Sequence, residues 1–342
     1  LNIMTKKALI VGVTGQDGSY MAELLLKKKY KVLGVMRRLS MFGTERVEHL
    51  YKKYPQKFDT AYGDLIDGNS LRRNIEMFKP DEIYNFGAQS HVRISFDLPE
   101  STFTYNANST LMLLEIVKNY FPKCKFYQAC SSEMFGASPP PQSENTKFEP
   151  QSVYGVSKVS SYYLTNFYRR AYNLYACAGI LFNHESPRRS PNFVTRKITL
   201  SIARLIAGKQ KKIELGNISA LRDWGFAGDY MEAIWLMMQQ KKPDNFVIAT
   251  GKNYSVKDFV EYCFKLVGLD WKQYVSTNVN KYKRPAEVPS LLGDSRKARK
   301  KLGWKPKVNF QELCKMMLES DLNKFGLTID EAKKKFSKSK KK

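Results

Sequence analysis

Three glycines spaced three residues apart, just after a short apolar run, constrain the fold of this chain more than any other feature. Residues 8–18 read ALIVGVTGQDG. Glycine allows positive φ and close approach to the backbone, and a helix that begins there offers unpaired N–H groups to an anion. The pattern predicts a strand, a tight turn and a helix that together bind the diphosphate of a dinucleotide; a plain tight turn is the alternative.

The rest of the first half alternates short β-branched runs with stretches that suit helices, which is typical of a parallel sheet with crossover helices. We expect strands at 8–14, 31–36, 58–62, 82–86, 125–130 and 174–182, and helices at 19–28, 45–54, 70–78, 109–120 and 152–173. Residues 136–151 contain three consecutive prolines and are expected to form a loop. The sequence therefore predicts an α/β protein with a doubly wound parallel sheet of the Rossmann type.

The length of 342 residues suggests about two domains. Beyond residue 184 the alternation weakens, and glycines, prolines and charged residues multiply. We expect residues 4–182, joined by about 223–251, to form the dinucleotide-binding domain, and about 183–222 plus 252–332 to form a second, smaller α/β lobe for the substrate. Residues 333–342 hold seven lysines and are expected to be a solvated, disordered tail.

The chain is strongly basic, with 57 Lys and Arg against 32 Asp and Glu and a formal net charge of +25. Outside the tail, the basic residues form separate runs at 27–29, 209–212 and 296–301 rather than one stripe interleaved with aromatic residues. A solvated surface and an anionic small-molecule ligand are the favoured explanations. A nucleic-acid or other polyanion partner is the alternative.

The five cysteines, at 124, 130, 177, 263 and 314, form no Cys-x-x-Cys pair, and the chain has three histidines. This usage predicts reduced thiols, a cytoplasmic location and no metal site. No run approaches the ~20 apolar residues that cross a bilayer, and residues 1–8 lack the apolar core of a signal peptide. We therefore expect a protein that neither spans a membrane nor is secreted.

The end of the second expected strand indicates which dinucleotide binds. NAD-binding folds usually place Asp or Glu there, about 20 residues after the glycines, to accept from the ribose 2′-hydroxyl. This chain has no acidic residue between Glu23 and Glu45 and instead has Arg37 and Arg38. Because a guanidinium binds a 2′-phosphate that a carboxylate would repel, NADP is favoured. Two solvated arginines are the alternative.

Two groups of side chains indicate the chemistry. Tyr154 and Lys158 lie four residues apart in an expected helix, so they share a face. The ammonium, together with the positive nicotinamide ring of a bound cofactor, is expected to lower the phenol pKa from ~10 to near 7, which corresponds to roughly 4 kcal/mol at about 1.36 per unit. Ser131 and Glu133 follow the strand at 125–130, at the sheet edge where ligands bind in open α/β folds.

Glu133 is the informative residue of this set, because oxidation or epimerisation at one alcohol needs no additional carboxyl group. A dehydratase does need one. Removing a proton next to a ketone and expelling hydroxide from the neighbouring carbon requires a base that then acts as an acid. A glutamate that caps the following turn is the alternative.

Several longer segments carry a resemblance to a known family. They are VTGQDGSYMAELLL, AQSHVRISFDLPE, YQACSSEMFG, YGVSK, ILFNHESPRR, ALRDWGFAGDYMEAIWLM and RPAEVPSLLGD. In these segments the chain resembles the GDP-mannose 4,6-dehydratases of the extended short-chain dehydrogenase/reductase family, over residues 7–325. The motifs NHESPRR and RDWG separate that family from related sugar dehydratases and epimerases.

The resemblance implies roles for individual residues. It implies that the catalytic groups are Ser131, Glu133, Tyr154 and Lys158. The implied NADP contacts are Gly12, Val13, Thr14, Gly15, Gln16, Asp17, Arg37, Arg38, Leu39, Ser40, Asp64, Leu65, Phe86, Gly87, Ala88, Gln89, Ser90, Tyr154, Lys158, His184 and Arg189. The implied contacts with the GDP-sugar are Ser90, Ser131, Glu133, Asn183, Val194, Lys197, Arg222, Arg284 and Glu287.

The reaction that the resemblance implies converts GDP-D-mannose to GDP-4-keto-6-deoxy-D-mannose, in GDP-fucose biosynthesis, with NADP recycled internally. The resemblance also implies a homodimer or homotetramer in which the loop at 37–44 reaches a neighbouring cofactor site. The alternative enzymes are another nucleotide-sugar epimerase or reductase and a dehydratase that also reduces its product. The non-enzyme alternative is a basic polyanion-binding protein on a Rossmann scaffold, which intact Tyr154, Lys158 and Glu133 disfavour.

Some positions depart from the family pattern. Ser131 stands where the family usually has Thr, Ser101 where it has a cofactor-contacting Tyr, and Ser190 where it has Gly. Phe86 and Gly87 replace a usual Leu-Ala pair, and the lysine-rich tail has no family counterpart. The changes at Ser101, Phe86 and Gly87 are expected to alter cofactor affinity.

Overall fold

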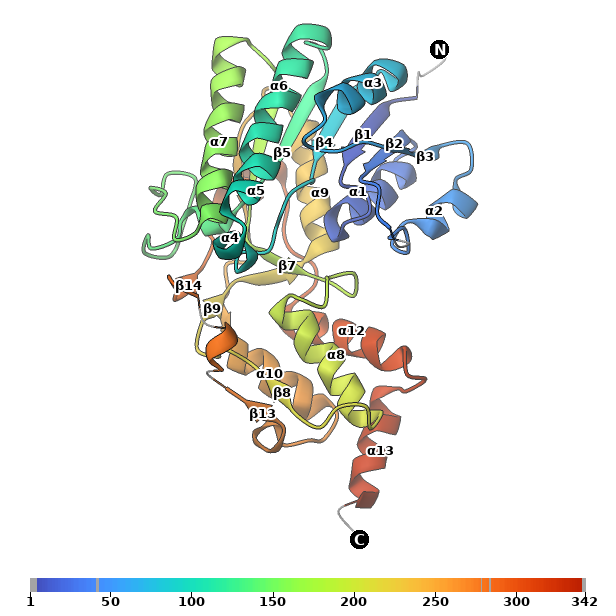
Figure 1. Ribbon diagram of the computed structural model, residues 1–342, viewed down its shortest axis with the longest axis vertical. Coiled ribbons are helices and arrows are strands. Elements are labelled where there is room, and N and C mark those ends of the chain that lie inside the picture. Colours follow the sequence, from blue (N-terminus) through green and yellow to red (C-terminus); the bar gives the residue numbers. More distant parts are fainter. Residues whose placement is uncertain (1–4, 41–42, 278, 283, 340–342) are drawn as a thin grey trace.

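The computed structural model describes residues 5–40, 43–277, 279–282 and 284–339. The molecule has two parts, an upper one built on a parallel sheet and a lower one built mainly on helices (Figure 1). Short strands, among them β7 (Asn183–Glu185) and β9 (Leu221–Arg222), lie between the two parts (Figure 1). In none of the described ranges is there a helix long and apolar enough to span a membrane.

Seven parallel strands form the main sheet, in the order β11-β6-β5-β4-β1-β2-β3. They are β1 (Lys7–Val11), β2 (Lys31–Met36), β3 (Phe58–Tyr62), β4 (Glu82–Asn85), β5 (Lys125–Ser131), β6 (Ala176–Leu181) and β11 (Phe246–Ile248). The winding direction reverses between β1 and β4, and ligands bind outside the carboxyl ends of the strands at such a point. The predicted doubly wound sheet is thereby confirmed.

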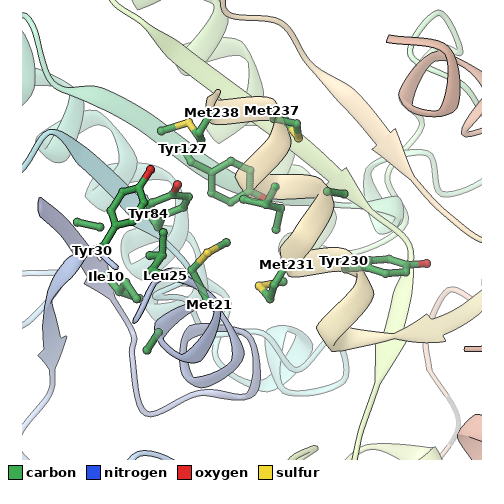
Figure 2. Packing of buried hydrophobic residues seen from close by; sticks show 14 of the residues in the cluster. Ile10, Met21, Leu25, Tyr30, Tyr84, Tyr127, Tyr230, Met231, Met237 and Met238 are labelled. Carbon is green, nitrogen blue, oxygen red and sulfur yellow. The ribbon is translucent and has the colours of Figure 1, made fainter. Parts of the chain in front are cut away.

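Helices cover both faces of this sheet. One face carries α1 (Gln16–Lys27), α9 (Ala227–Met238) and α11 (Arg296–Leu302), and the other carries α3 (Gly68–Phe78), α6 (Ser109–Tyr120) and α7 (Val153–Ala171). Figure 2 shows the first face, where Met21 and Leu25 of α1 and Met231 of α9 pack around the sheet beside Ile10. Each such buried side chain contributes about 1.5–3 kcal/mol to folding.

Two elements from the second half of the chain, α9 and β11, pack with the main sheet. β11 pairs in parallel with β6, and α9 packs against α1. α9 and β11 therefore contribute to the same hydrophobic core as the N-terminal strands.

The lower part is a cluster of helices with three small sheets at its border. Its helices are α8 (Val194–Ile206), α10 (Val256–Leu266), α12 (Phe310–Asn323) and α13 (Ile329–Ser339), and all four share a core with Trp224. The small sheets pair β7 (Asn183–Glu185) with β10 (Trp224–Phe226), β8 (Ile213–Glu214) with β13 (Val275–Ser276), and β9 (Leu221–Arg222) with β12 (Tyr254–Ser255) and β14 (Ser290–Leu291).

Several element boundaries differ from those expected. β1 ends at Val11 rather than at residue 14, because Gly12 has φ 81° and turns the chain. α1 accordingly begins at Gln16, and α2 (Glu48–Lys53) is shorter than the helix expected at 45–54. Sequence patterns did not indicate α4 (Ile94–Asp97), α5 (Pro99–Phe103) or the π-helical turn Thr104–Asn108 that leads into α6.

The expectation of a disordered tail is wrong for its first residues, because α13 extends to Ser339. The helix begins with reciprocal bonds in which Glu331 N donates to Thr328 Oγ1 at 3.2 Å and Thr328 N donates to Glu331 Oε2 at 2.8 Å. Ile329 and Ala332 are buried in the lower core. Lys335 Nζ donates to the Ile206 carbonyl at the end of α8, a favourable place for a cation. Residues 340–342 lie outside the described residues.

Candidate active site

A single cavity of about 1000 Å³ lies at the carboxyl ends of the central strands and continues onto α8 and β9 of the lower part. It brings together most of the residues singled out in the sequence. Those that line it are Gly12, Gly15, Gln16, Asp17, Phe86, Gly87, Ala88, Ser90, Ser131, Glu133, Tyr154, Lys158, Asn183, His184, Arg189, Val194, Lys197, Arg222, Arg284 and Glu287.

The other predicted residues lie outside the lining: Val13, Thr14, Arg37, Arg38, Leu39, Ser40, Asp64, Leu65 and Gln89. Val13 is buried in the core. Gln89 supports its own loop, since its Nε2 donates to Thr102 Oγ1 at 2.9 Å and its Oε1 accepts from His91 N at 2.6 Å. The residues at 37–40 follow β2 and are exposed, while residues 41–42 lie outside the described residues.

The glycine-rich turn forms a tight cradle between β1 and α1. Gly12 has φ 81°, and a Cβ atom there would lie 2.9 Å from the backbone nitrogen of Gly87. Gly15 precedes α1 and has no side chain to cap it. The amide groups of the first helical turn, which have no partner within a helix, therefore border the cavity. This arrangement suits an anionic diphosphate.

A short turn after β5 carries Glu133. Ser131 Oγ accepts from Glu133 N at 3.2 Å and caps the 3₁₀ turn Ser132–Met134. Ser152 Oγ accepts from Gly155 N at 3.0 Å and begins α7. A Cβ atom on Gly155 would lie 2.8 Å from the Glu133 carbonyl oxygen, so glycine allows α7 to start directly against the turn. As a result, the side chains of the turn and of Tyr154 line one cavity.

The protein's own groups together do not lower the pKa of Tyr154, and the expected lowering by a bound nicotinamide ring stays a prediction. Burial raises the pKa of Tyr154 to about 12; the hydrogen bond with Ser131 lowers it by less, and the charge of Glu133 raises it further. Lys158 Nζ lies 5.9 Å from the centre of the Tyr154 ring and donates to the Ala129 carbonyl at 2.9 Å. The ammonium is thus directed to the backbone rather than to the phenol oxygen.

Two guanidinium groups face the carboxylate of Glu133. Arg284 Nη1 lies 3.7 Å from Glu133 Oε1. Arg222 is buried on β9, where burial lowers its pKa and the charge of Glu133 opposes that effect. The carboxylate and the two cations therefore share one electrostatic environment at the junction of the two parts.

Sequence reasoning missed several other residues of the lining, which include His91, Phe193, Arg204, Asn217 and Tyr282. Arg204 follows Lys197 by seven residues on α8, so helical periodicity is a signal that would have found it. The Lys197 ammonium lies 3.5 Å from the centre of the Tyr282 ring. No local pattern indicates this contact, because the two residues are far apart in sequence.

The fold and the site together define the class of this protein. A doubly wound parallel sheet carries a glycine-rich turn after β1, and Ser131, Tyr154 and Lys158 meet at its carboxyl edge. This combination defines the short-chain dehydrogenases/reductases.

Comparisons identify the family within that class. The family profile of GDP-mannose 4,6 dehydratase matches residues 9–317. GDP-mannose 4,6 dehydratase 1 of Arabidopsis thaliana is 53% identical over 326 residues, which cover 93% of this chain and 90% of that protein. The chain belongs to the GDP-mannose 4,6-dehydratase family, as its sequence motifs indicated.

Solved structures with lower identity share the fold. UDP-glucuronic acid 4-epimerase from Bacillus cereus, in complex with UDP-glucuronic acid and NAD, is similar with a TM-score of 0.82 at 21% identity, over 93% of this chain and 99% of that one. RMD from Pseudomonas aeruginosa, complexed with NADPH, is similar with a TM-score of 0.77 at 19% identity, over 94% of this chain and 100% of that one.

Replacing Gly12 with alanine should destabilise the fold. The new Cβ meets the Gly87 backbone at 2.9 Å, and the left-handed φ adds a strain of about 1–2 kcal/mol. Urea unfolding is the measurement. Gly15→Ala is the matched control, because Gly15 has φ −71° and its Cβ would meet nothing closer than 3.2 Å. Equal losses of stability in the two variants would contradict this role of Gly12.

Proposed function

We propose that this chain dehydrates GDP-D-mannose to GDP-4-keto-6-deoxy-D-mannose, with NADP as an internally recycled hydride carrier. The observation that carries the proposal is the buried carboxyl of Glu133, which lies in one cavity with Ser131, Tyr154, Lys158 and the glycine-rich turn. Membership of the family supports GDP-mannose as the substrate.

The residues present fit a nicotinamide dinucleotide. The turn at 12–18 would hold the diphosphate, since its backbone leaves no room for a side chain at Gly12. Arg37 and Arg38, exposed after β2, would bind a 2′-phosphate and so select NADP. When bound, the nicotinamide would accept a hydride from C4 of the sugar and return it to C6, while a proton that originates from solvent adds at C5. We assign this cofactor to residues 4–182 with about 223–251, and the GDP-sugar to the remaining lobe.

Tyr154 acts on the C4 hydroxyl group. The phenolate form takes the hydroxyl proton as C4 becomes a ketone, and the Ser131 hydroxyl hydrogen-bonds the same oxygen. Because burial keeps Tyr154 protonated, the phenolate must be stabilised by nearby positive charge. Arg189, whose charge lowers the pKa of Tyr154, Lys158, which is buried one helical turn away, and the positive ring of a bound nicotinamide would supply that charge.

Glu133 carries out the elimination. The ketone at C4 acidifies the C5 proton, which the carboxylate removes. The resulting carboxylic acid then protonates the C6 hydroxyl, which leaves as water, so one group serves as base and then as acid. Lys197, Arg222 and Arg284 line the same cavity and would bind the anionic GDP moiety. The cysteines in the described chain are all free and buried, which accords with a cytoplasmic location.

We also propose that the protein is a homodimer or a homotetramer, in which a second copy covers an apolar groove on the outer face of α6 and α7. The groove holds about 430 Å³ and is lined by Phe103, Ala107, Asn108, Leu111, Ser160, Tyr163, Leu164 and Phe167. Tyr163 is 59% exposed and Phe167 is 47% exposed. Grouped exposed aromatic side chains of this kind mark association surfaces.

Glu133→Gln should separate oxidation from elimination. The amide keeps the size of the side chain but removes the base, so C4 oxidation survives, water loss nearly stops and reduced cofactor accumulates. Tyr154→Phe should instead give no reduced cofactor. Single-turnover absorbance, together with solvent deuterium at C5 of the product, checks both. Near wild-type formation of a deuterated 4-keto-6-deoxy product by Glu133→Gln would assign the base to another group.

Replacing both Arg37 and Arg38 with serine should weaken NADP binding far more than NAD binding. Each lost charge-assisted hydrogen bond to a 2′-phosphate removes about 1.5–3 kcal/mol, so NADP affinity should fall at least about tenfold. Titration calorimetry with the two dinucleotides is the measurement. The control replaces Arg72 and Arg73, a neighbouring pair on α3 outside the cavity lining. Equal losses for NADP and NAD would refute the NADP assignment.

Phe167→Glu should dissociate the oligomer, because it places a charge in the apolar groove. Light scattering at micromolar concentration should show the wild-type chain as a dimer or larger and the variant as smaller. Met77→Glu is the control, since Met77 is 79% exposed on α3, away from the groove. A monomeric wild-type chain, or an unchanged mass for Phe167→Glu, would reject this interface.

A further inference from the structure

An ion pair borders the cavity and is not used by the proposed chemistry. Asp17 lies in the first turn of α1, and His184 lies in β7. Asp17 Oδ2 lies 2.8 Å from His184 Nε2, and the Phe182 carbonyl oxygen lies 2.7 Å from His184 Nδ1. The two side chains are 21% and 12% exposed.

Both ring nitrogens of His184 therefore face acceptor oxygens. A neutral imidazole has one N–H and makes only one of these bonds as a donor, whereas an imidazolium makes both. Burial lowers the pKa of His184, but the charge and hydrogen bond of Asp17 outweigh it and raise the pKa above its ordinary value. Burial raises the pKa of Asp17, but His184 outweighs it and lowers that pKa. The shared proton thus resides on the imidazole.

The other groups packed around the His184 ring do not change the assignment of the shared proton to the imidazole. Tyr230 of α9 stacks on the ring with centroids 5.0 Å apart, and burial raises its pKa so that the phenol is neutral. The charge of Arg189 lowers the pKa of His184 and also that of Asp17. Lys158 is the other cation that faces Asp17. Asp17 is the one acidic side chain among the described groups that act on the ring.

Further bonds fasten the same two segments together. Gln16 Nε2 donates both to Asp17 Oδ1 at 3.0 Å and to the His184 carbonyl at 3.0 Å. Ser186 Oγ donates to Gln16 Oε1 at 2.8 Å. The start of α1 is therefore bound to β7 and the residue that follows it. These segments carry the glycine-rich turn on one side and Asn183 on the other.

The position of Asp17 creates an electrostatic requirement. Its carboxylate stands in the first turn of α1, where the proposed function places the anionic diphosphate of a dinucleotide. A lone carboxylate there would repel that anion, because like charges at close range in a partly buried site are strongly unfavourable. The positive charge of His184 neutralises the negative charge of the Asp17 carboxylate.

We propose that His184, as an imidazolium, is a positioning residue that clasps the dinucleotide turn to β7 and neutralises Asp17 for the bound diphosphate. The choice of ligand rests on the proposed function, whereas the charge state of the pair does not. Both members of the Asp17–His184 pair are charged at pH values above the lowered pKa of Asp17 and below the raised pKa of His184. We call this charged pair the clasp. Dinucleotide affinity should therefore fall as pH rises through the titration of His184.

Nuclear magnetic resonance of the ¹⁵N-histidine-labelled chain tests the clasp itself, because the chain has three histidines. One imidazole should carry two protons at pH 7, titrate above the ordinary ~6.5 and vanish from the spectrum in His184→Gln. Asp17→Asn should move that titration down by about one unit, which is tenfold in proton affinity. A neutral His184 at pH 7, or a titration that Asp17→Asn leaves unchanged, would overturn the proposal.

Titration calorimetry with NADP between about pH 6 and 9 tests the role toward the ligand. His184→Gln should weaken binding about tenfold at pH 7 and flatten its pH dependence, and adding Asp17→Asn should restore most of the affinity. His49→Gln is the control, because His49 also pairs with a carboxylate, Glu23 at 2.7 Å, but is 45% exposed.

The outcomes separate this inference from the proposed function. Unchanged affinity in His184→Gln, or no recovery in the double variant, rejects the neutralising role. A wild-type chain that binds no dinucleotide while its His184 titration responds to Asp17→Asn overturns the proposed cofactor and leaves the charged clasp standing.

Discussion

The approach of two backbone turns at the centre of the sheet is the constraint on which the site depends. Gly12, after β1, lies so close to Gly87, after β4, that a single Cβ atom would meet backbone at 2.9 Å. These strands flank the point where the winding direction reverses, so the contact sets the floor of the crevice. The start of α1 and the turn after β5 are placed relative to that floor, and with them Asp17 and Glu133.

Polar contacts between distant segments then complete the site around this floor. Ser131 caps the 3₁₀ turn that carries Glu133, and Ser152 caps α7, which carries Tyr154. Gly155 allows the start of α7 to contact that turn. Asp17 and His184 join the sheet part to β7. Arg222 and Arg284 bring positive charge from the lower part to Glu133. Part of the basic excess of the chain is thus directed into the cavity, where an anionic ligand would use it.

Local patterns in the sequence predicted the fold well where one residue type satisfies a local requirement. The glycine spacing, the β-branched runs and the Tyr154–Lys158 spacing report backbone freedom, burial and helix periodicity, which act over a few residues. The predictions that were wrong or incomplete concern residues placed by contacts between distant parts of the chain. The tail reads as disordered by charge alone, yet α13 forms because Ile329 and Ala332 are buried among helices from elsewhere in the chain. Arg204 and Tyr282 join the cavity through tertiary packing.

The sequence by itself determined the class of fold, the place of the glycine-rich turn and the spacing of Tyr154 and Lys158, because each depends on short-range patterns. Only the tertiary structure determined the pKa values and charges of the side chains in the site. Burial raises the pKa of Tyr154 to about 12 despite a lysine four residues away, since Lys158 donates to the backbone instead. The charge on His184 likewise depends on Asp17, 167 residues distant. Protonation follows from the distances between charges and their exclusion from water, and only the folded chain sets these.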